Sequence, residues 1–128
     1  MDSVKPSALG GEKLGAFLAC TDAEVARDFY ENKLGLTFVS DDQYLLRFDA
    51  NGSSVTLQKV KEVTPTAYIQ LGWHVVDIEA SVADLTGRGI KFENYGGDDS
   101  GILTFPSGNK YAWFKDPDGN LLSLDQTP

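Results

Sequence analysis

The stretch TDAEVARDFYENKLGL, residues 21–36, decides the fold class of this chain. Thr21 and Glu24 form a T-x-x-E capping box, which predicts the start of a helix. Apolar side chains then recur at helical spacing, and Gly35 stands where a glycine commonly ends a helix. β-like runs flank this helix, one before it and three after it, at residues 13–20, 36–40, 44–49 and 54–60. The last two runs are joined by Asn-Gly, a strong hairpin signal.

The same order of elements starts again in the second half of the chain. The expected elements are a strand over 67–76, a helix over 78–85, and strands at 90–93, 111–115 and 121–125. The helix-capping aspartates, Asp22 and Asp77, lie 55 residues apart, and the helix-ending glycines, Gly35 and Gly89, lie 54 apart. The hairpin tips DANG and DPDG are 67 residues apart, so roughly a dozen extra residues fall around residues 96–108 of the second half.

This repeat predicts an α+β fold made of two βαβββ modules. Neither module alone buries its sheet face well, so we expect both to pack as one domain. The expected domain covers residues 12–128, with modules at about 12–62 and 65–128, after a flexible N-terminal arm over residues 1–11.

Composition narrows the classes of function. The chain has 128 residues, 41% of them hydrophobic, and 19 acidic against 11 basic residues give a formal net charge of −8. No basic run is present, which argues against a nucleic-acid partner, and no segment approaches the roughly 18 apolar residues of a membrane span. The start of the chain lacks the apolar stretch of a secretory signal, and the single cysteine, Cys20, excludes an internal disulfide. We therefore expect a cytoplasmic protein with no membrane partner.

Three segments together resemble the vicinal oxygen chelate superfamily. They are residues 21–36 with their Phe-Tyr and Leu-Gly pairs, WHVVDIEASVADLTGRGI at 73–90, and FKDPDGNLLSL at 114–124. This superfamily includes glyoxalase I, extradiol dioxygenases, fosfomycin-resistance enzymes and bleomycin-resistance proteins. The resemblance covers about residues 13–126. It implies two βαβββ modules placed edge to edge, with sheets that curl around an open cleft.

The resemblance also implies positions for a divalent metal in that cleft. They fall on Gly15, Gln70 and Ser123, with a fourth near Thr56 or Gln58. Gly15 has no side chain, and a neutral amide or hydroxyl is a poor ligand for an ion that prefers carboxylate and imidazole. We therefore expect no metal and no other cofactor, with a divalent metal as the alternative.

His74, the only histidine, is the one candidate for catalytic chemistry, because an imidazole titrates near neutral pH. Strand alternation puts Gln70, Gly72 and His74 on one face. A ligand-contacting or acid–base role is one hypothesis for His74. A relocated metal site with Glu93 or Asp98 is a second, and a rim position with no catalytic role is a third.

The same alternation predicts the lining of the cleft. The expected lining residues are Gly15, Phe17, Ala19, Gln70, Gly72, His74, Leu121 and Ser123. For the strand over 111–115 two registers stay open, since either Tyr111 and Trp113 or Ala112 and Phe114 line the cavity. The candidate ligand-binding residues are Phe17, Gln70, His74, Tyr111, Trp113 and Ser123.

Other reactive side chains have simpler interpretations. Cys20 falls on the strand face that points toward the helices, which favours a buried structural thiol over a nucleophile. Asp116 and Asp118 lie in a turn signature, where carboxylates accept hydrogen bonds from backbone amides. The Gly/Asp-rich segment within residues 95–108 is either a mobile lid or an ordinary loop.

Two classes of function remain. The first is a metal-free small-molecule binding protein that resembles bleomycin-resistance proteins and sequesters an aromatic or cationic ligand in the cleft, as in antibiotic resistance. The alternative is a glyoxalase-like lyase, epimerase or dioxygenase that uses a metal or His74. The absence of charged ligands at the metal positions favours the first class. The resemblance also implies a homodimer in which the partner chain completes the cleft.

Overall fold

The computed structural model describes Lys5 and residues 7–128. The first half contains β1 (Gly15–Cys20), α1 (Ala23–Arg27), the π-helix η1 (Asp28–Lys33), β2 (Thr37–Asp41), β3 (Leu45–Ala50) and β4 (Ser53–Lys59). The second half contains β5 (Ile69–His74), α2 (Ile78–Gly87), β6 (Phe92–Glu93), β7 (Leu103–Thr104), β8 (Lys110–Lys115) and β9 (Leu121–Gln126). The predicted repeat of strand, helix and three strands is confirmed. The second half adds β7, a short strand within its long loop.

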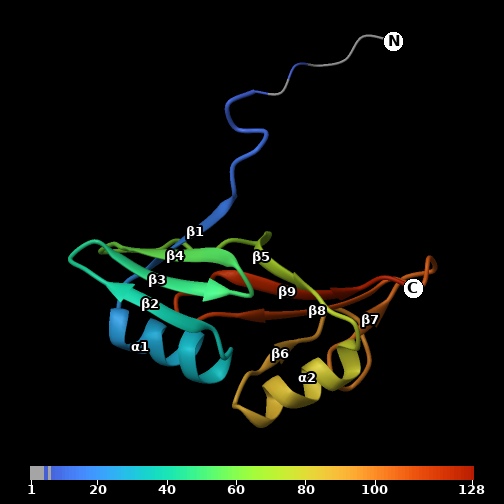
Figure 1. Ribbon diagram of the computed structural model, residues 1–128. Helices are drawn as coiled ribbons and strands as arrows, with labels where there is room; N and C mark the ends of the chain where they lie inside the picture. Colours follow the sequence, from blue (N-terminus) through green and yellow to red (C-terminus); the bar gives the residue numbers. More distant parts are fainter. Residues whose placement is uncertain (1–4, 6) are drawn as a thin grey trace.

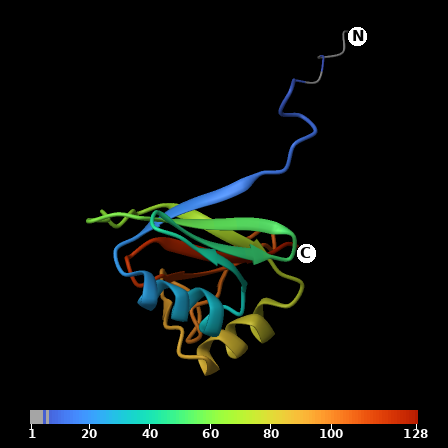
Figure 2. The same ribbon diagram turned by 60° about the vertical axis from the view of Figure 1, so that its left-hand side comes forward.

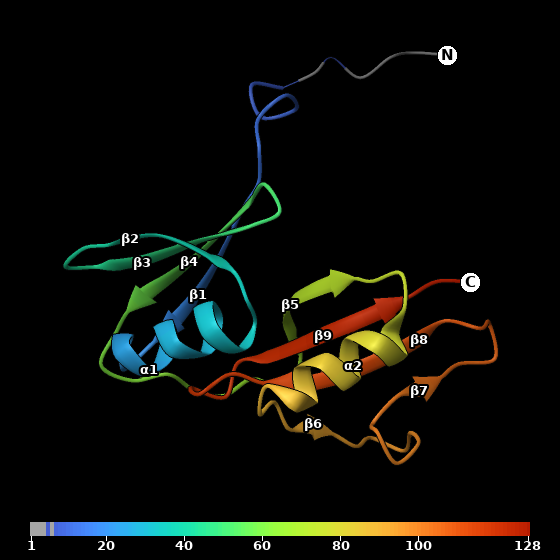
Figure 3. The ribbon, with the colours of Figure 1, turned by 60° about the horizontal axis from the view of Figure 1, so that its bottom comes forward.

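The strands form two sheets, one for each half. Their orders are β1-β4-β3-β2 in sheet A and β5-β9-β8-β6 in sheet B, with β7 paired to β8. In each sheet the first strand pairs in parallel with the last strand of its own module, and the other pairs are antiparallel. Both helices lie on the same side of the two sheets (Figures 1 and 3). We call the opposite side of each sheet its open face.

The core lies between the sheets and the helices, and it is shared by the two modules. Its largest fully buried side chains include Tyr30 from η1, Phe48 from β3 and Phe114 from β8. The ring centroids of Phe29 and Phe114 are 6.4 Å apart, so η1 of the first module packs against β8 of the second. Helices this short are unstable in isolation, and burial of their apolar faces against the sheets stabilises them.

The start of α1 confirms the predicted capping aspartate but not the predicted capping box. Asp22 is the N-cap, and its carboxylate accepts hydrogen bonds from the backbone N–H groups of Glu24 and Val25. Thr21 does not cap the helix, because its hydroxyl donates to Oδ1 of Asp118 at 2.6 Å. The predicted Thr21–Glu24 capping box is therefore wrong, although the helix begins where it was expected.

Other local predictions agree with the structure. Asp77 caps α2 by accepting a hydrogen bond from the N–H of Ala80. The hairpin between β3 and β4 turns through Asn51 and Gly52, which both have positive φ, as a tight Asn-Gly turn requires. Within the described residues, no helix is long and apolar enough to cross a bilayer.

The turn between β8 and β9 joins the two modules through buried hydrogen bonds. Oδ2 of Asp116 accepts from the Tyr30 hydroxyl and from Nδ2 of Asn120, both at 2.7 Å. Oδ1 of Asp116 accepts from the N–H groups of Asp118 and Asn120. Asn120 also donates to the carbonyl of Ala19 on β1 at 3.0 Å. The Phe-Tyr and DPDGN segments that carry the family resemblance therefore meet in one network, and Asp116 serves the turn as expected.

The strand expected over residues 67–76 needs a correction, and part of the expected N-terminal arm lies outside the described residues. A bulge in β5 places Ile69, rather than Gln70, opposite Leu121 on β9. The strict alternation expected from Gln70 onward is therefore broken at the start of this strand, which begins at Ile69 rather than at residue 67. The expected arm over 1–11 includes residues 1–4 and 6, which lie outside the described residues.

Candidate ligand-binding site

Alternation along β8 gives the open face of sheet B its aromatic character. Ala112 and Phe114 are fully buried on the helix side of the sheet. Tyr111 and Trp113 are half-buried and point the opposite way. Of the two registers that the sequence left open, the structure has Tyr111 and Trp113 on the open face.

Four aromatic side chains form a continuous row on this face, in the order Tyr95, Trp113, Tyr111 and Phe105. The rings of Trp113 and Tyr111 are stacked, with centroids 5.9 Å apart and planes inclined by 12°. Tyr95 meets Trp113 edge-on at 5.4 Å, and Phe105 meets Tyr111 edge-on at 5.2 Å. Both arrangements are favourable for aromatic pairs. We call these four residues the aromatic row.

Two shallow hollows flank the aromatic row. The first lies beside residues 65–68 and is lined further by Ile69, Tyr95, Trp113, Lys115 and Leu121. The second lies beside residues 105–107 and is lined further by Ile69, Asn109, Tyr111 and Trp113. Trp113 lines both hollows and is therefore central to the candidate site.

The two hollows differ in charge. Lys115, an exposed residue at the end of β8, brings a positive charge to the first hollow. The described residues that line the second hollow carry no charge. A cationic group is therefore better accommodated at the second hollow, beside Tyr111 and Phe105.

Ser123 lies at the floor of the open face. It is opposite Trp113 on β8 and opposite Gly72 on β5, and it is only 3% exposed. Its Oγ is 2.7 Å from the point where a Cβ on Gly72 would stand, so the hydroxyl occupies space that the glycine leaves open. Ser123 therefore supports the aromatic row from below.

His74 forms a pair with an acidic residue at the end of sheet B. Its Nδ1 is 2.7 Å from Oδ1 of Asp125, which is the cross-strand neighbour of Tyr111. The imidazole is 93% exposed, whereas the carboxylate is 19% exposed. A carboxylate at Nδ1 orients an imidazole and leaves Nε2 for proton transfer. His74 lines neither hollow, however, so the pair stands at the rim of the site.

The loop before β7 is held together by hydrogen bonds between its own residues. Oδ1 of Asp98 accepts hydrogen bonds from the Ser100 hydroxyl and from the N–H groups of Ser100 and Ile102. These hydrogen bonds hold the pKa of the Asp98 carboxyl below its usual range. Asn94 fixes the same loop by accepting from two backbone N–H groups and donating to the Asp98 carbonyl. This pattern favours the ordinary-loop interpretation over a mobile lid.

The other predicted site residues lie elsewhere. Phe17 is on the open face of sheet A, 71% exposed, and lines neither hollow. Gln70 lies at the bulge of β5 and is exposed. The chain therefore brings Tyr111, Trp113 and Ser123 together and leaves Phe17 on the other sheet.

Sequence reasoning missed two members of the aromatic row. Tyr95 and Phe105 lie on the two sides of the long loop of the second half, close to β6 and β7. Their aromatic character was visible in the sequence, but their positions depend on the pairing of both short strands with β8.

Cys20 is buried, as predicted. Burial raises the pKa of its thiol from 9.0 to about 11, with a further contribution from the nearby carboxylate of Asp118. Little thiolate forms at neutral pH, and the thiolate is the nucleophilic species. The residue is therefore a structural side chain.

A model of the Glyoxalase/Bleomycin resistance protein/Dioxygenase superfamily matches residues 14–124. The chain belongs to this superfamily. A superfamily member from Sphaerobacter thermophilus is similar in structure, with a TM-score of 0.72, 26% identity, and coverage of 91% of this chain and 97% of that chain. A search of curated proteins gave no match.

Two superfamily structures with more specific names share the fold. FosX, a fosfomycin resistance protein from Listeria monocytogenes, has a TM-score of 0.72 and 13% identity, and the alignment covers 90% of this chain and 92% of FosX. TnmS3, an antibiotic binding protein from a Streptomyces species, has a TM-score of 0.67 and 24% identity, with coverage of 92% and 98%. Identity at this level shows the fold alone.

The residues at the expected metal positions do not fit a divalent ion. Gly15 offers no side chain, and Ser123 is buried with its hydroxyl packed against Gly72. Gln70, Thr56 and Gln58 are neutral, so these positions give a metal no charged donor. In the described part of the chain, no group of three His, Cys, Asp or Glu side chains is arranged to hold a metal. The alternative site of His74 with Glu93 or Asp98 therefore lacks geometric support.

Proposed function

We propose that this superfamily member is a metal-free binding protein that sequesters an aromatic or cationic small molecule on the aromatic row and does not change it chemically. The observation that carries the proposal is the stacked pair of Trp113 and Tyr111 between two hollows. A planar group can stack against such rings, and a cation is attracted to their faces, with about 0.5–2 kcal/mol for each contact.

Charge and family context support the same proposal. The formal net charge of −8 favours the arrival of a cation, and the uncharged lining of the second hollow accepts one without repulsion. One structural neighbour is described as an antibiotic binding protein and another as a fosfomycin resistance protein. We propose the same general role, antibiotic binding, for this chain. We also propose that the protein acts in the cytoplasm.

We further propose that the protein is a homodimer. In the described residues, β1 and β5 each pair on one side only, so each sheet has an unpaired edge at its first strand. Leu14 and Phe17, next to or within β1, are exposed apolar side chains, as is Tyr68 just before β5. A second copy that covers these edges would complete the cleft and bury the apolar residues.

Titration calorimetry tests the binding proposal. We expect bleomycin or the planar cation proflavine to bind the wild-type protein, and Trp113→Ala to weaken binding about 3- to 30-fold, because one stacking contact is lost. In the proposed homodimer, Phe17 of one protomer contributes to the cleft of the other, so we expect Phe17→Ala to weaken binding as well. Cys20→Ser and Tyr44→Ala are the controls, since Cys20 is buried and Tyr44 lies outside both hollows. Equal affinities of Trp113→Ala and the wild type would contradict the proposal.

The second candidate is a metal-free enzyme, and the His74–Asp125 pair is the observation that favours it. Such an enzyme would use Nε2 of His74 as a general base. Turnover of the methylglyoxal–glutathione adduct or of a catechol by chelator-treated protein, with loss of turnover in His74→Asn, would support the enzyme. Ligand binding without turnover would support the binding protein.

A further inference from the structure

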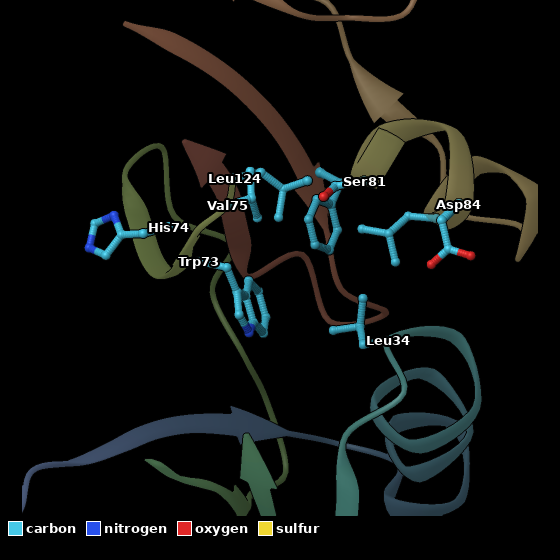
Figure 4. Close-up of a pocket in the computed structure, with 9 residues that line it drawn as sticks. Leu34, Trp73, His74, Val75, Ser81, Asp84 and Leu124 are labelled. Carbon is cyan, nitrogen blue, oxygen red and sulfur yellow. The ribbon is translucent and has the colours of Figure 1, made fainter. Parts of the chain in front are cut away.

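A cavity separate from both hollows lies on the helix side of sheet B, away from the aromatic row. It has a volume of about 200 Å³ and lies between α2, the end of η1 and the sheet (Figure 4). Its apolar walls are Leu34, Trp73, Val75, Leu85, Phe114 and Leu124. Figure 2 gives another view of the two helices that lie side by side beneath the sheets.

The cavity exists because α2 packs closely against the sheet only in its first half. Ile78 and Val82 are buried there, whereas Leu85, one turn later, is only partly buried. Leu34 stands across the gap at the end of η1.

Aromatic rings form the floor of this cavity. Trp73 is stacked on Phe114, with centroids 6.4 Å apart and planes inclined by 18°. The imidazole of His74 points away from the cavity (Figure 4). The floor is therefore apolar, and water in such a space finds few hydrogen-bond partners.

The solvent side of the cavity is polar. Asp84 lines the mouth and is paired with Arg88, which also donates to the carbonyl of Asn32 at the end of η1. This contact bridges the two helices. Ser81 also lines the cavity, and none of the described residues forms a hydrogen bond with its hydroxyl.

The geometry points to a second ligand site, for a compact and uncharged aromatic molecule with one hydroxyl group. The ring lies against Trp73, and the hydroxyl reaches Ser81 at the mouth. An apolar cavity of about 150 Å³ suffices for benzene, so this volume matches a single substituted ring. A charged group is disfavoured, because burial in apolar walls would remove its hydration.

This site is independent of the proposed function. Phe114 and Trp113 are neighbours on β8, so their side chains lie on opposite faces of sheet B. Each site therefore has its own tryptophan: Trp73 in the helix-side cavity and Trp113 in the aromatic row. The chain has only these two tryptophans.

The experiment uses the two indole N–H signals of ¹⁵N-labelled full-length protein, assigned with Trp73→Phe and Trp113→Phe. The probe is benzyl alcohol. We expect the Trp73 signal to shift and saturate, with half-saturation on the order of 1 mM, as a molecule of this size allows. A Trp73 signal that stays unmoved up to roughly tenfold higher concentration would overturn the inference. A shift of the Trp113 signal alone would also overturn it, while leaving the proposed function intact.

Matched variants locate the binding. Ser81→Phe adds a ring at the mouth, and Leu34→Phe enlarges the opposite wall, so each should weaken the Trp73 response at least tenfold. Ala80→Phe is the control, because Ala80 is an exposed neighbour on the same helix and does not line the cavity. We expect its response to match the wild type. Wild-type responses in both Ser81→Phe and Leu34→Phe would show that the probe binds elsewhere.

Discussion

Replacement of Tyr30 by Phe removes one hydroxyl from the network that joins the two modules. The Tyr30 side chain is fully buried, and its hydroxyl donates to Oδ2 of Asp116 at 2.7 Å. Burial and the Asp116 carboxylate raise the pKa of Tyr30 far above its usual value, so the hydroxyl is protonated and donates at neutral pH. Asp116 keeps the hydrogen bonds from Asn120 and Asp118 in the variant.

The size of the effect follows from this geometry. The ring of residue 30 remains in the core, so the change removes a hydrogen bond and creates no large cavity. A hydrogen bond to a charged group contributes about 1.5–3 kcal/mol. We expect Tyr30→Phe to lower the free energy of unfolding by about 2 kcal/mol and the Tm by roughly 5–10 °C.

Urea unfolding followed by tryptophan fluorescence measures the change. The midpoint should fall while the slope stays constant, which marks a loss of stability without a change in the unfolded state. Tyr44→Phe is the matched control, because Tyr44 is 65% exposed and its substitution should cost less than about 0.5 kcal/mol. Equal stabilities of Tyr30→Phe and Tyr44→Phe would refute the assignment of the Phe-Tyr and DPDGN segments to a stabilising network.

Three further predictions concern the thiol, the assembly and the metal positions. The pKa of the Cys20 thiol is about 11 in the folded protein against 9.0 as its ordinary value, so the free energy of unfolding should fall as the pH rises from 9 to 11. Native protein should resist iodoacetamide and react once unfolded in urea; rapid labelling of native protein would contradict the burial. Light scattering at micromolar concentration should give about twice the 13.9 kDa chain mass, and a mass equal to one chain would exclude the homodimer. Chelator treatment should leave the Tm unchanged and elemental analysis should find no stoichiometric divalent metal, whereas a loss of several degrees would reveal a metal at other residues.

The fold could be predicted because its signals are local and occur twice. Asp22 and Asp77 cap their helices, and Gly35 and Gly89 follow them with positive φ. The Asn-Gly turn fixes one hairpin. These signals depend on backbone chemistry within a few residues, so the sequence carries them completely.

The site was less predictable because its key choices depend on residues distant in sequence. The segment over 111–114 is apolar on both faces, and pairing with β9 and burial under α2 decide which face is open. β7 is only two residues long and forms by pairing with β8. Thr21 does not cap the helix as expected, because its hydroxyl donates a hydrogen bond to Asp118, nearly 100 residues later in the chain.

The alternation of β8 has a consequence for how such a protein diversifies. Substitutions at Tyr111 and Trp113 remodel the open face, whereas Ala112 and Phe114 are buried in the core and Phe114 also lines the helix-side cavity. Under the proposed binding function, selection on ligand preference and selection on folding therefore act on different residues of one strand. A library randomised at 111 and 113 alone samples new recognition surfaces on an unchanged scaffold, which makes this strand a natural starting point for directed evolution.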